Sequence, residues 1–132
     1  MPTEPMEPSG DLALRTVAMP ADTNPTGDIF GGWIMSLMDL AAGTTASLRA
    51  KGRVATAAVS NLSFLAPVKV GDVVCVYTAV TRTGRTSITL SVEAWVLRAA
   101  QPPRRRVTAA EFVLVAVDEN GKPRALPEGE GA

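Results

Sequence analysis

Asp39 is the side chain that most needs a chemical explanation, because it lies within a strongly apolar segment that opens on two glycines. If residues 31–50 are helical, at about 100° per residue, one stripe roughly 60° wide carries the small and polar residues Gly32, Ser36, Asp39 and Gly43. The remaining surface of residues 32–43 is apolar, which is typical of a helix buried in a core. A buried acid is costly unless it is paired or used, so Asp39 is predicted to be a site residue.

The chain contains no histidine, and this narrows the chemistry open to Asp39. It excludes Ser-His-Asp and Cys-His catalysis, histidine metal sites and histidine acid–base catalysis. If the protein is an enzyme, we therefore expect a carboxylate base and no metal site. The single cysteine, Cys75, alternates with strand residues and is interpreted as packing. One cysteine cannot form a disulfide within the chain and suits a reducing cytosol, so a cytoplasmic protein is predicted.

Length and charge predict one globular domain without a charged macromolecular partner. The 132 residues are enough for a single core, and 46% hydrophobic residues exclude a disordered chain. The net charge is zero and no apolar run approaches the roughly 18 residues of a membrane span, so we expect neither nucleic acid nor a membrane as partner. The domain is predicted over residues 11–127, between disordered tails at residues 1–10 and 128–132.

One long helix and a sheet are expected to position Asp39. Strands or extended segments are predicted at residues 12–18, 54–64, 72–81, 86–97 and 107–117. The helix is expected to end at Gly52 as a left-handed cap, and residues 99–106 are predicted to be a loop because they hold two prolines and three arginines. We expect the four long strands to be joined by hairpins and to wrap the helix, with a second subunit covering the rest of it.

Three sequence segments resemble a known family. They are Asp22-Thr23-Asn24 followed by Gly27-Asp28-Ile29-Phe30-Gly31-Gly32-Trp33 and Met38-Asp39; Phe64-Leu65-Ala66-Pro67-Val68 with Gly71-Asp72-Val73; and Ala116-Val117-Asp118 with Gly121-Lys122-Pro123-Arg124-Ala125-Leu126-Pro127. Together they resemble the acyl-CoA thioester hydrolases of the hot-dog fold, especially the bacterial YciA-type branch. The resemblance implies an α+β fold in which about five antiparallel strands wrap one long central helix. It also implies hydrolysis of acyl-CoA to a carboxylic acid and coenzyme A, without a cofactor.

The residue types suit thioester hydrolysis, which needs an activated water or a nucleophile and donors for the developing oxyanion. Asp39 is the candidate base, or the candidate nucleophile through a mixed anhydride. Gly31 and Gly32 open the helix, so their backbone N–H groups are candidate oxyanion donors. Asn24 resembles the asparagine that this family places in the site. The choice between water activation and anhydride formation stays open.

Helix geometry indicates that each site is shared between two chains. Gly32 and Asp39 are seven residues apart, which is roughly 10 Å along a helix. One thioester carbon cannot lie within about 3–4 Å of both groups. We therefore expect a homodimer with two antiparallel helices, in which Asp39 serves a thioester held by the partner's glycine pair. The family often builds trimers of dimers, so a hexamer is also expected.

The resemblance implies coenzyme A contacts at the turn residues Gly84, Arg85, Thr86 and Ser87, with Arg124 as a further contact. Arginine suits phosphate through its forked donors. Residues 104–106 are weaker phosphate candidates. The alternative function is a non-catalytic acyl-CoA sensor of the same fold, which the retained acid disfavours. A dehydratase is disfavoured because that chemistry generally uses a histidine. The acyl chain length stays open, although the resemblance implies a broad range of short to medium chains.

Overall fold

The computed structural model describes residues 5–129, which form one helix, one sheet and a short 3-10 turn. The elements in chain order are β1 Asp11–Val17, the 3-10 turn Pro20–Asp22, α1 Gly31–Ala50, β2 Val54–Phe64, β3 Val73–Thr83, β4 Ser87–Arg98 and β5 Gln101–Ala116. The predicted tails fall partly on residues 1–4 and 130–132, which lie outside the described residues. Within the described part of the N-terminal tail, the Ser9 N–H donates to Glu93 Oε1 at 3.0 Å.

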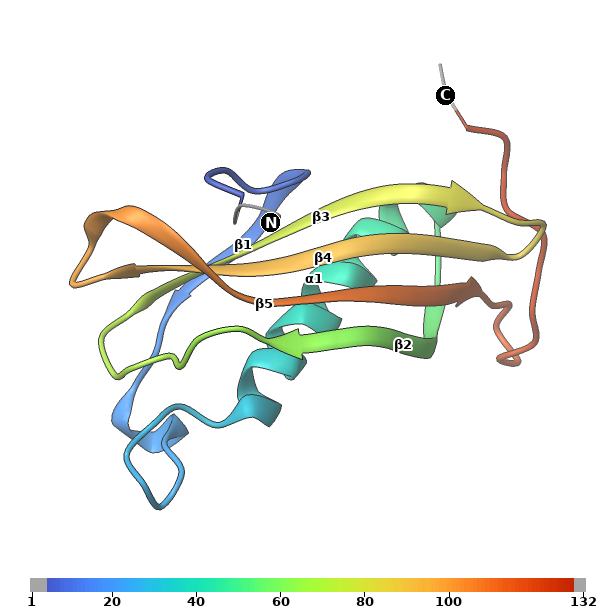
Figure 1. Ribbon diagram of the computed structural model, residues 1–132. Helices are drawn as coiled ribbons and strands as arrows, with labels where there is room; N and C mark the ends of the chain where they lie inside the picture. Colours follow the sequence, from blue (N-terminus) through green and yellow to red (C-terminus); the bar gives the residue numbers. More distant parts are fainter. Residues whose placement is uncertain (1–4, 130–132) are drawn as a thin grey trace.

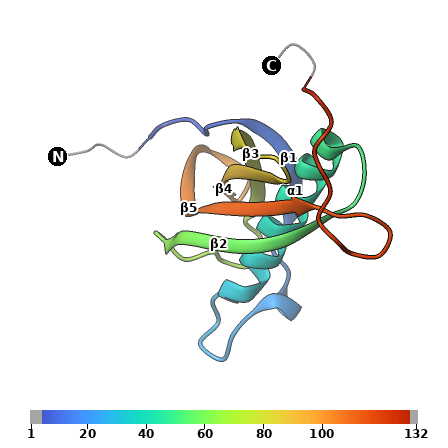
Figure 2. The same cartoon turned by 90° about the vertical axis from the view of Figure 1, so that its right-hand side faces the viewer.

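The five strands form one sheet in the order β1-β3-β4-β5-β2, and every neighbouring pair is antiparallel. Helix α1 runs across one face of this sheet, which curves around it (Figures 1 and 2). The predicted α+β class, the five strands and the single wrapped helix are confirmed. The predicted helix over residues 31–50 has the same bounds as α1.

The core lies between one face of α1 and the inner face of the sheet. Buried helix residues recur three to five positions apart and form one stripe: Ile34, Met38, Ala41, Ala42, Ala46 and Ala50. They pack against buried aliphatic residues of the central strands, including Val76 of β3, Leu90 of β4 and Leu114 of β5. The residues of β4 alternate between the two faces of the sheet, since Leu90 and Val92 face this core while Trp95 packs on the outer face with Cys75. Alanine side chains let the helix lie close to the strands.

The prediction of a loop at residues 99–106 is wrong. Ala99 and Ala100 both have positive φ, at 52° and 55°, and form a tight two-residue turn between β4 and β5. Arg98 then pairs with Gln101, and β5 begins at once. Pro102 and Pro103 lie where the register between β4 and β5 shifts. Regular pairing is interrupted there, so the missing N–H groups of the prolines remove no backbone hydrogen bond between the two strands.

The predicted hairpin between the second and third strands is also wrong. β2 pairs with β5, at the opposite end of the sheet from β1, and the chain crosses from β2 to β3 without pairing them. β2 is consequently an edge strand, and nearly all its residues are exposed. An exposed edge strand of 11 residues presents unpaired backbone groups.

The left-handed cap of helix α1 lies one residue earlier than the predicted position, Gly52. Lys51 takes the left-handed conformation, with φ of 55°, and its backbone N–H bonds to Ser47 O. Gly52 is needed for a different reason. A Cβ at this position would lie 2.7 Å from a guanidinium nitrogen of Arg124, which donates to the helix carbonyl of Ala50.

Candidate active site

Asp39 lies outside the buried stripe of α1 and is exposed in the single chain. Its Oδ1 accepts a hydrogen bond of 2.6 Å from the hydroxyl of Thr56 on β2. Both residues line a groove of about 580 Å³ between α1 and β2, together with Gly43 and Val54. The sequence analysis did not single out Thr56, since only the pairing of β2 with β5 brings that strand beside the helix.

The first turn of α1 offers two unused backbone donors. The N–H groups of Trp33 and Ile34 both bond to Phe30 O, at 3.1 and 3.3 Å. Within residues 5–129, the N–H groups of Gly31 and Gly32 have no acceptor, and Phe30 supplies no side-chain cap. These two donors lie at the positive end of the helix dipole, where a developing oxyanion is stabilised.

The two glycines differ in what surrounds them. A Cβ on Gly31 would lie 3.2 Å from the ring of Phe64, so a larger residue would press on that ring. A Cβ on Gly32 would meet no atom within 4 Å. The space outside Gly32 is therefore open to a ligand or a partner subunit.

Asn24 is held in the loop before α1 by its own side chain. Its Oδ1 accepts hydrogen bonds from the backbone N–H groups of Thr26 and Asp28, both at 3.0 Å, and from the Thr26 hydroxyl. Backbone N–H groups can only donate, so the orientation of the amide is settled. Its Nδ2 has no acceptor among the described residues. Asn24 therefore both closes a turn and presents a free N–H donor.

Asn24 and Gly31 line the same cavity, of about 420 Å³, beside the start of α1. Its walls are largely apolar and come from the loop before α1, from α1, from the end of β2 and the residues after it, and from β5. Asp28 lies on the lining, and its carboxylate pairs with the ammonium of Lys69. Thr108 of β5 also lines this cavity and was not singled out from the sequence.

The predicted catalytic residues thus form two groups in one chain. Asn24 and Gly31 share the cavity at the helix start, whereas Asp39 lies in the separate groove two helical turns further on. The helical rise of 1.5 Å per residue separates Gly32 from Asp39 by about 10 Å. Neither group by itself joins a base to the oxyanion donors.

The predicted coenzyme A residues lie at the β3–β4 turn. Gly84 N–H bonds to Ser87 O at 2.9 Å, which closes the turn, and the carbonyls of Arg85 and Thr86 accept from Leu126 and Ala116. The Arg85 side chain is exposed. Arg124 donates to Val117 O and Ala50 O, so two of its five N–H donors hold the C-terminal segment to the end of α1. Contact of these residues with coenzyme A stays a prediction.

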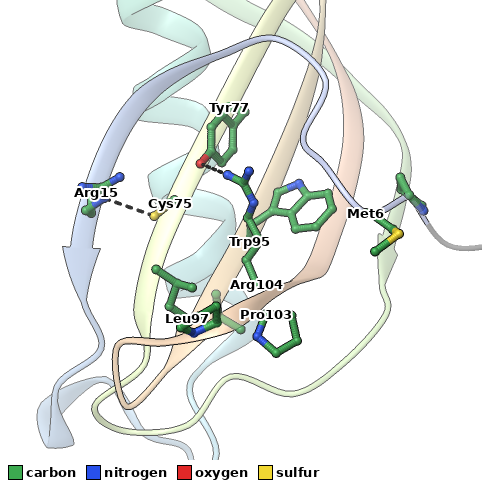
Figure 3. A pocket seen from close by; sticks show the side chains of 11 residues that line it. Met6, Arg15, Cys75, Tyr77, Trp95, Leu97, Pro103 and Arg104 are labelled. Carbon is green, nitrogen blue, oxygen red and sulfur yellow. Dashed lines mark hydrogen bonds between the residues drawn. The ribbon is translucent and has the colours of Figure 1, made fainter.

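The opposite, outer face of the sheet carries a different pocket, of about 540 Å³ (Figure 3). Cys75, Tyr77 and Trp95 lie on its floor, with Arg15 and Arg104 beside them. Arg15 Nε donates to Cys75 Sγ at 3.3 Å, and this hydrogen bond raises the pKa of the guanidinium. Arg104 donates to the Tyr77 hydroxyl at 3.1 Å. The arginines of this pocket are thus paired inside the chain.

Two further observations concern residues 5–129. They contain no group of three or more His, Cys, Asp or Glu side chains placed to hold a metal ion. Within this range, no helix has the length and apolar character needed to cross a membrane.

Comparison with known proteins gives consistent matches. Residues 26–100 match the family model described as the thioesterase superfamily. The acyl-CoA thioester hydrolase YciA of Escherichia coli K12 is 54% identical over 123 residues, which cover 91% of this chain and 93% of that protein. The hexameric thioesterase y2039 from Yersinia pestis superposes with a TM-score of 0.90 at 54% identity, covering 93% of this chain and all of the other. HI0827, described as a hexameric broad-specificity acyl-coenzyme A thioesterase, superposes with a TM-score of 0.86 at 50% identity, covering 92% and 84%.

Proposed function

We propose that this chain, which belongs to the thioesterase superfamily and is an acyl-CoA thioester hydrolase, performs hydrolysis in sites shared between two subunits. In each site, Asp39 of one subunit acts on a thioester whose carbonyl oxygen is bound by Gly31 and Gly32 of the other. The observation that carries this proposal is the pair of unused N–H donors about 10 Å from an exposed carboxylate on the same helix face.

The second subunit is expected to cover the exposed face of α1 and the edge strand β2. Leu40 and Leu48, which flank the groove beside Asp39, are 61% and 76% exposed in the single chain. Both would be costly to leave in water in a stable protein. Antiparallel packing of two α1 helices would bring each Asp39 toward the partner's glycine pair, because a two-fold axis places the same patch of both chains in contact.

The chemistry follows from these groups. The thioester oxygen accepts hydrogen bonds from the two glycine N–H groups, which stabilise the oxyanion as it forms. Asp39 either removes a proton from a water whose oxygen attacks the carbonyl carbon, or attacks that carbon itself to form a mixed anhydride that water then cleaves. In both routes the C–S bond breaks, and coenzyme A leaves as a thiolate that then takes a proton.

Thr56 and Asn24 assist hydrolysis by donating hydrogen bonds, Thr56 to the carboxylate and Asn24 to the substrate or the water. The Thr56 hydroxyl donates to Asp39 and holds its carboxylate on the groove side of β2. The free Nδ2 of Asn24 offers a further donor to the thioester oxygen or the attacking water. No cofactor enters these steps, because coenzyme A is part of the substrate and the product.

The proposal also covers the extent, assembly and location of the protein. We assign the domain to residues 11–127, the assembly to a trimer of dimers and the location to the cytoplasm, with no nucleic-acid or membrane partner. The hexameric state of the similar thioesterases supports the assembly. The coenzyme A phosphates are assigned to the β3–β4 turn, where Arg85 is exposed.

Replacing Asp39 with asparagine tests the proposal. Thiol release from butyryl-CoA is expected to fall by roughly 1,000-fold, because asparagine cannot act as base or nucleophile. The unfolding midpoint should stay close to that of the wild type, since Asp39 is exposed and Asn can still accept from Thr56. Unchanged turnover in this variant would reject Asp39 as the catalytic group. Binding without turnover of any acyl-CoA by the wild-type protein would favour the sensor.

A further inference from the structure

Lys69 and Asp28 form an ion pair that joins two walls of the cavity at the start of α1. Asp28 lies on the loop before the helix, and Lys69 directly follows residues 64–68, which form another wall. A backbone hydrogen bond of 2.9 Å runs beside this pair, from Ile29 N–H to Val68 O. The pair and this bond together tie the loop to the crossover between β2 and β3. The proposed hydrolysis uses neither charge.

The Lys69 end of the pair is fixed to the sheet by a buried carboxylate. Asp72 is 1% exposed and accepts hydrogen bonds from Nε and Nη2 of Arg98, at 3.0 and 2.9 Å. Its Oδ2 also accepts the Lys69 backbone N–H at 2.9 Å, and its own N–H donates to Lys69 O at 3.0 Å. Breaking a buried pair of this kind is strongly destabilising, so the backbone of Lys69 has a fixed place.

The Asp28 end of the pair is bonded to Asn24 through the backbone. Asp28 N–H donates to Asn24 Oδ1 at 3.0 Å, and Asn24 N–H donates to Asp28 O at 2.7 Å. The same Asn24 amide carries the Nδ2 donor proposed to serve the thioester oxygen or the attacking water. A shift of Asp28 would therefore move this amide, because both hydrogen bonds would have to follow.

We propose that Lys69 and Asp28 are positioning residues, whose ion pair holds the Asn24 amide aimed at the thioester. This inference rests on the proposed function, and it assigns Lys69 no contact with the substrate. A half-exposed ion pair contributes little to stability as a rule. Its contribution here is to geometry, because a small displacement of a group that acts in the transition state lowers the rate strongly.

The first test removes one charge at this pair or at a distant site. Lys69 and Asp28 side chains are 47% and 37% exposed, so their replacement should leave the fold intact. Lys69→Met should lower kcat for butyryl-CoA by about 5-fold with little change in KM, because Asn24 is proposed to act in the transition state. Lys122→Met, at an exposed turn after β5, is the matched control and should leave kcat unchanged. Lys69→Arg restores the charge and should recover most of the lost kcat.

Dependence on Asn24 separates positioning from other roles. Asp28→Asn should lower kcat about as much as Lys69→Met, and the double variant should be no slower than either. In an Asn24→Ala background, Lys69→Met should cause no further loss, because no amide remains to be aimed. A loss that persists in this background would overturn the inference. An unchanged kcat in Lys69→Met or in Asn24→Ala would overturn it too.

Two further measurements test the same inference without relying on this cycle. S-butyryl-N-acetylcysteamine lacks the phosphates of coenzyme A, so Lys69→Met should lower kcat/KM equally for it and for butyryl-CoA. A loss confined to butyryl-CoA would overturn the inference, since it indicates a phosphate contact. Amide hydrogen exchange over residues 24–28, measured by mass spectrometry, should be faster in Lys69→Met than in wild type or Lys122→Met. Equal exchange in all three would overturn it as well.

Failure of the proposed function would have a different signature. Butyryl-CoA turnover would then survive in Asp39→Asn, whatever the exchange rates in the Lys69 variants.

Discussion

The outer-face pocket differs from the helix-face site, which is the proposed site at Asn24, Gly31, Gly32 and Asp39. The difference is whether their polar groups have hydrogen-bond partners within the chain. In the outer pocket, Arg15 pairs with Cys75, Arg104 with Tyr77, and the Trp95 indole donates to Glu93 at 3.1 Å. On the helix face, Gly31, Gly32, Asn24 and Thr108 all keep an unpaired group among the described residues, and Asp39 is exposed. On the outer face, Arg106 Nε is buried without a partner among the described residues, although Arg106 also pairs with Glu93. The residues lining the outer pocket are mostly paired within one chain, whereas the residues of the helix-face site keep several unpaired groups.

Under the proposed function, the outer pocket of the single chain is not the active site. A site shared between subunits is open and shallow until the partner arrives. The comparison predicts that changes on the helix face alter activity, while changes on the outer face alter stability.

The largest expected effect comes from dividing the helix-face site between two inactive variants. Asp39→Asn lacks the carboxylate, and Gly32→Leu fills the open space outside the glycine pair. Each variant alone should be nearly inactive. Co-expressed in equal amounts, random pairing makes about half of the dimers mixed, with one intact site of two, so activity should recover to about a quarter of wild type. The measurement is butyryl-CoA hydrolysis by the purified mixture.

Each variant expressed alone under the same conditions serves as the control for this recovery. Activity in the mixture no higher than the mean of the two separate variants would show that base and oxyanion donors come from the same chain. In that case the unpaired groups on the helix face would not indicate a site shared between two subunits, and the comparison with the outer face would no longer hold.

The outer face gives the next effect. Glu93 is buried and accepts from Ser9 N–H, Trp95 Nε1 and Arg106, the last at 3.1 Å. Glu93→Gln would leave the half-buried Arg106 without its counter-charge, so the free energy of unfolding should fall by about 2–4 kcal/mol. Urea denaturation measures this change. The kcat/KM of the folded protein should stay within about twofold of wild type, and a large loss of turnover at unchanged stability would contradict the division between the two faces.

A smaller effect is expected at Thr56, the positioning partner of Asp39. Thr56→Val removes the 2.6 Å hydrogen bond while keeping the side-chain shape. The kcat should fall by about 10-fold, since one hydrogen bond to a charged group contributes on the order of 1.5 kcal/mol. KM and the unfolding midpoint should change little, because Thr56 is exposed on an edge strand.

Thr56→Ser is the matched control, and it should restore kcat to near the wild-type value. A serine variant as slow as the valine variant would show that the Thr56 methyl group, and not its hydroxyl, matters to turnover.

Local pattern predicted some elements well and failed at others for identifiable reasons. Helix α1 was predictable because its small and polar residues fall in one stripe at the helical period, on an otherwise apolar segment that opens on a glycine pair. Residues 101–106 were predicted as loop because prolines and consecutive arginines are typical of loops. They are strand because the left-handed Ala99 and Ala100 turn the chain back onto β4.

The site residues also divide into those that a local motif predicts and those that it does not. Asp39, Asn24 and the glycine pair lie within 16 positions of one another, so one motif contains them. Thr56 and Thr108 could not be found this way, because ordinary threonines in strands give no local signal. Thr56 meets Asp39 only through the place of β2 beside the helix, and Thr108 meets the cavity only through its pairing with Phe64.

The amino-acid sequence by itself determined the length of the helix, the acid on it, the glycines that open it and the absence of histidine that leaves a carboxylate as base. These properties depend on residue type and short-range period. Only the tertiary structure decided which helix face is exposed, that β2 is an edge strand, and which hydroxyls lie near the site. Strand order and burial depend on contacts between residues far apart in the chain, and no local period records those contacts.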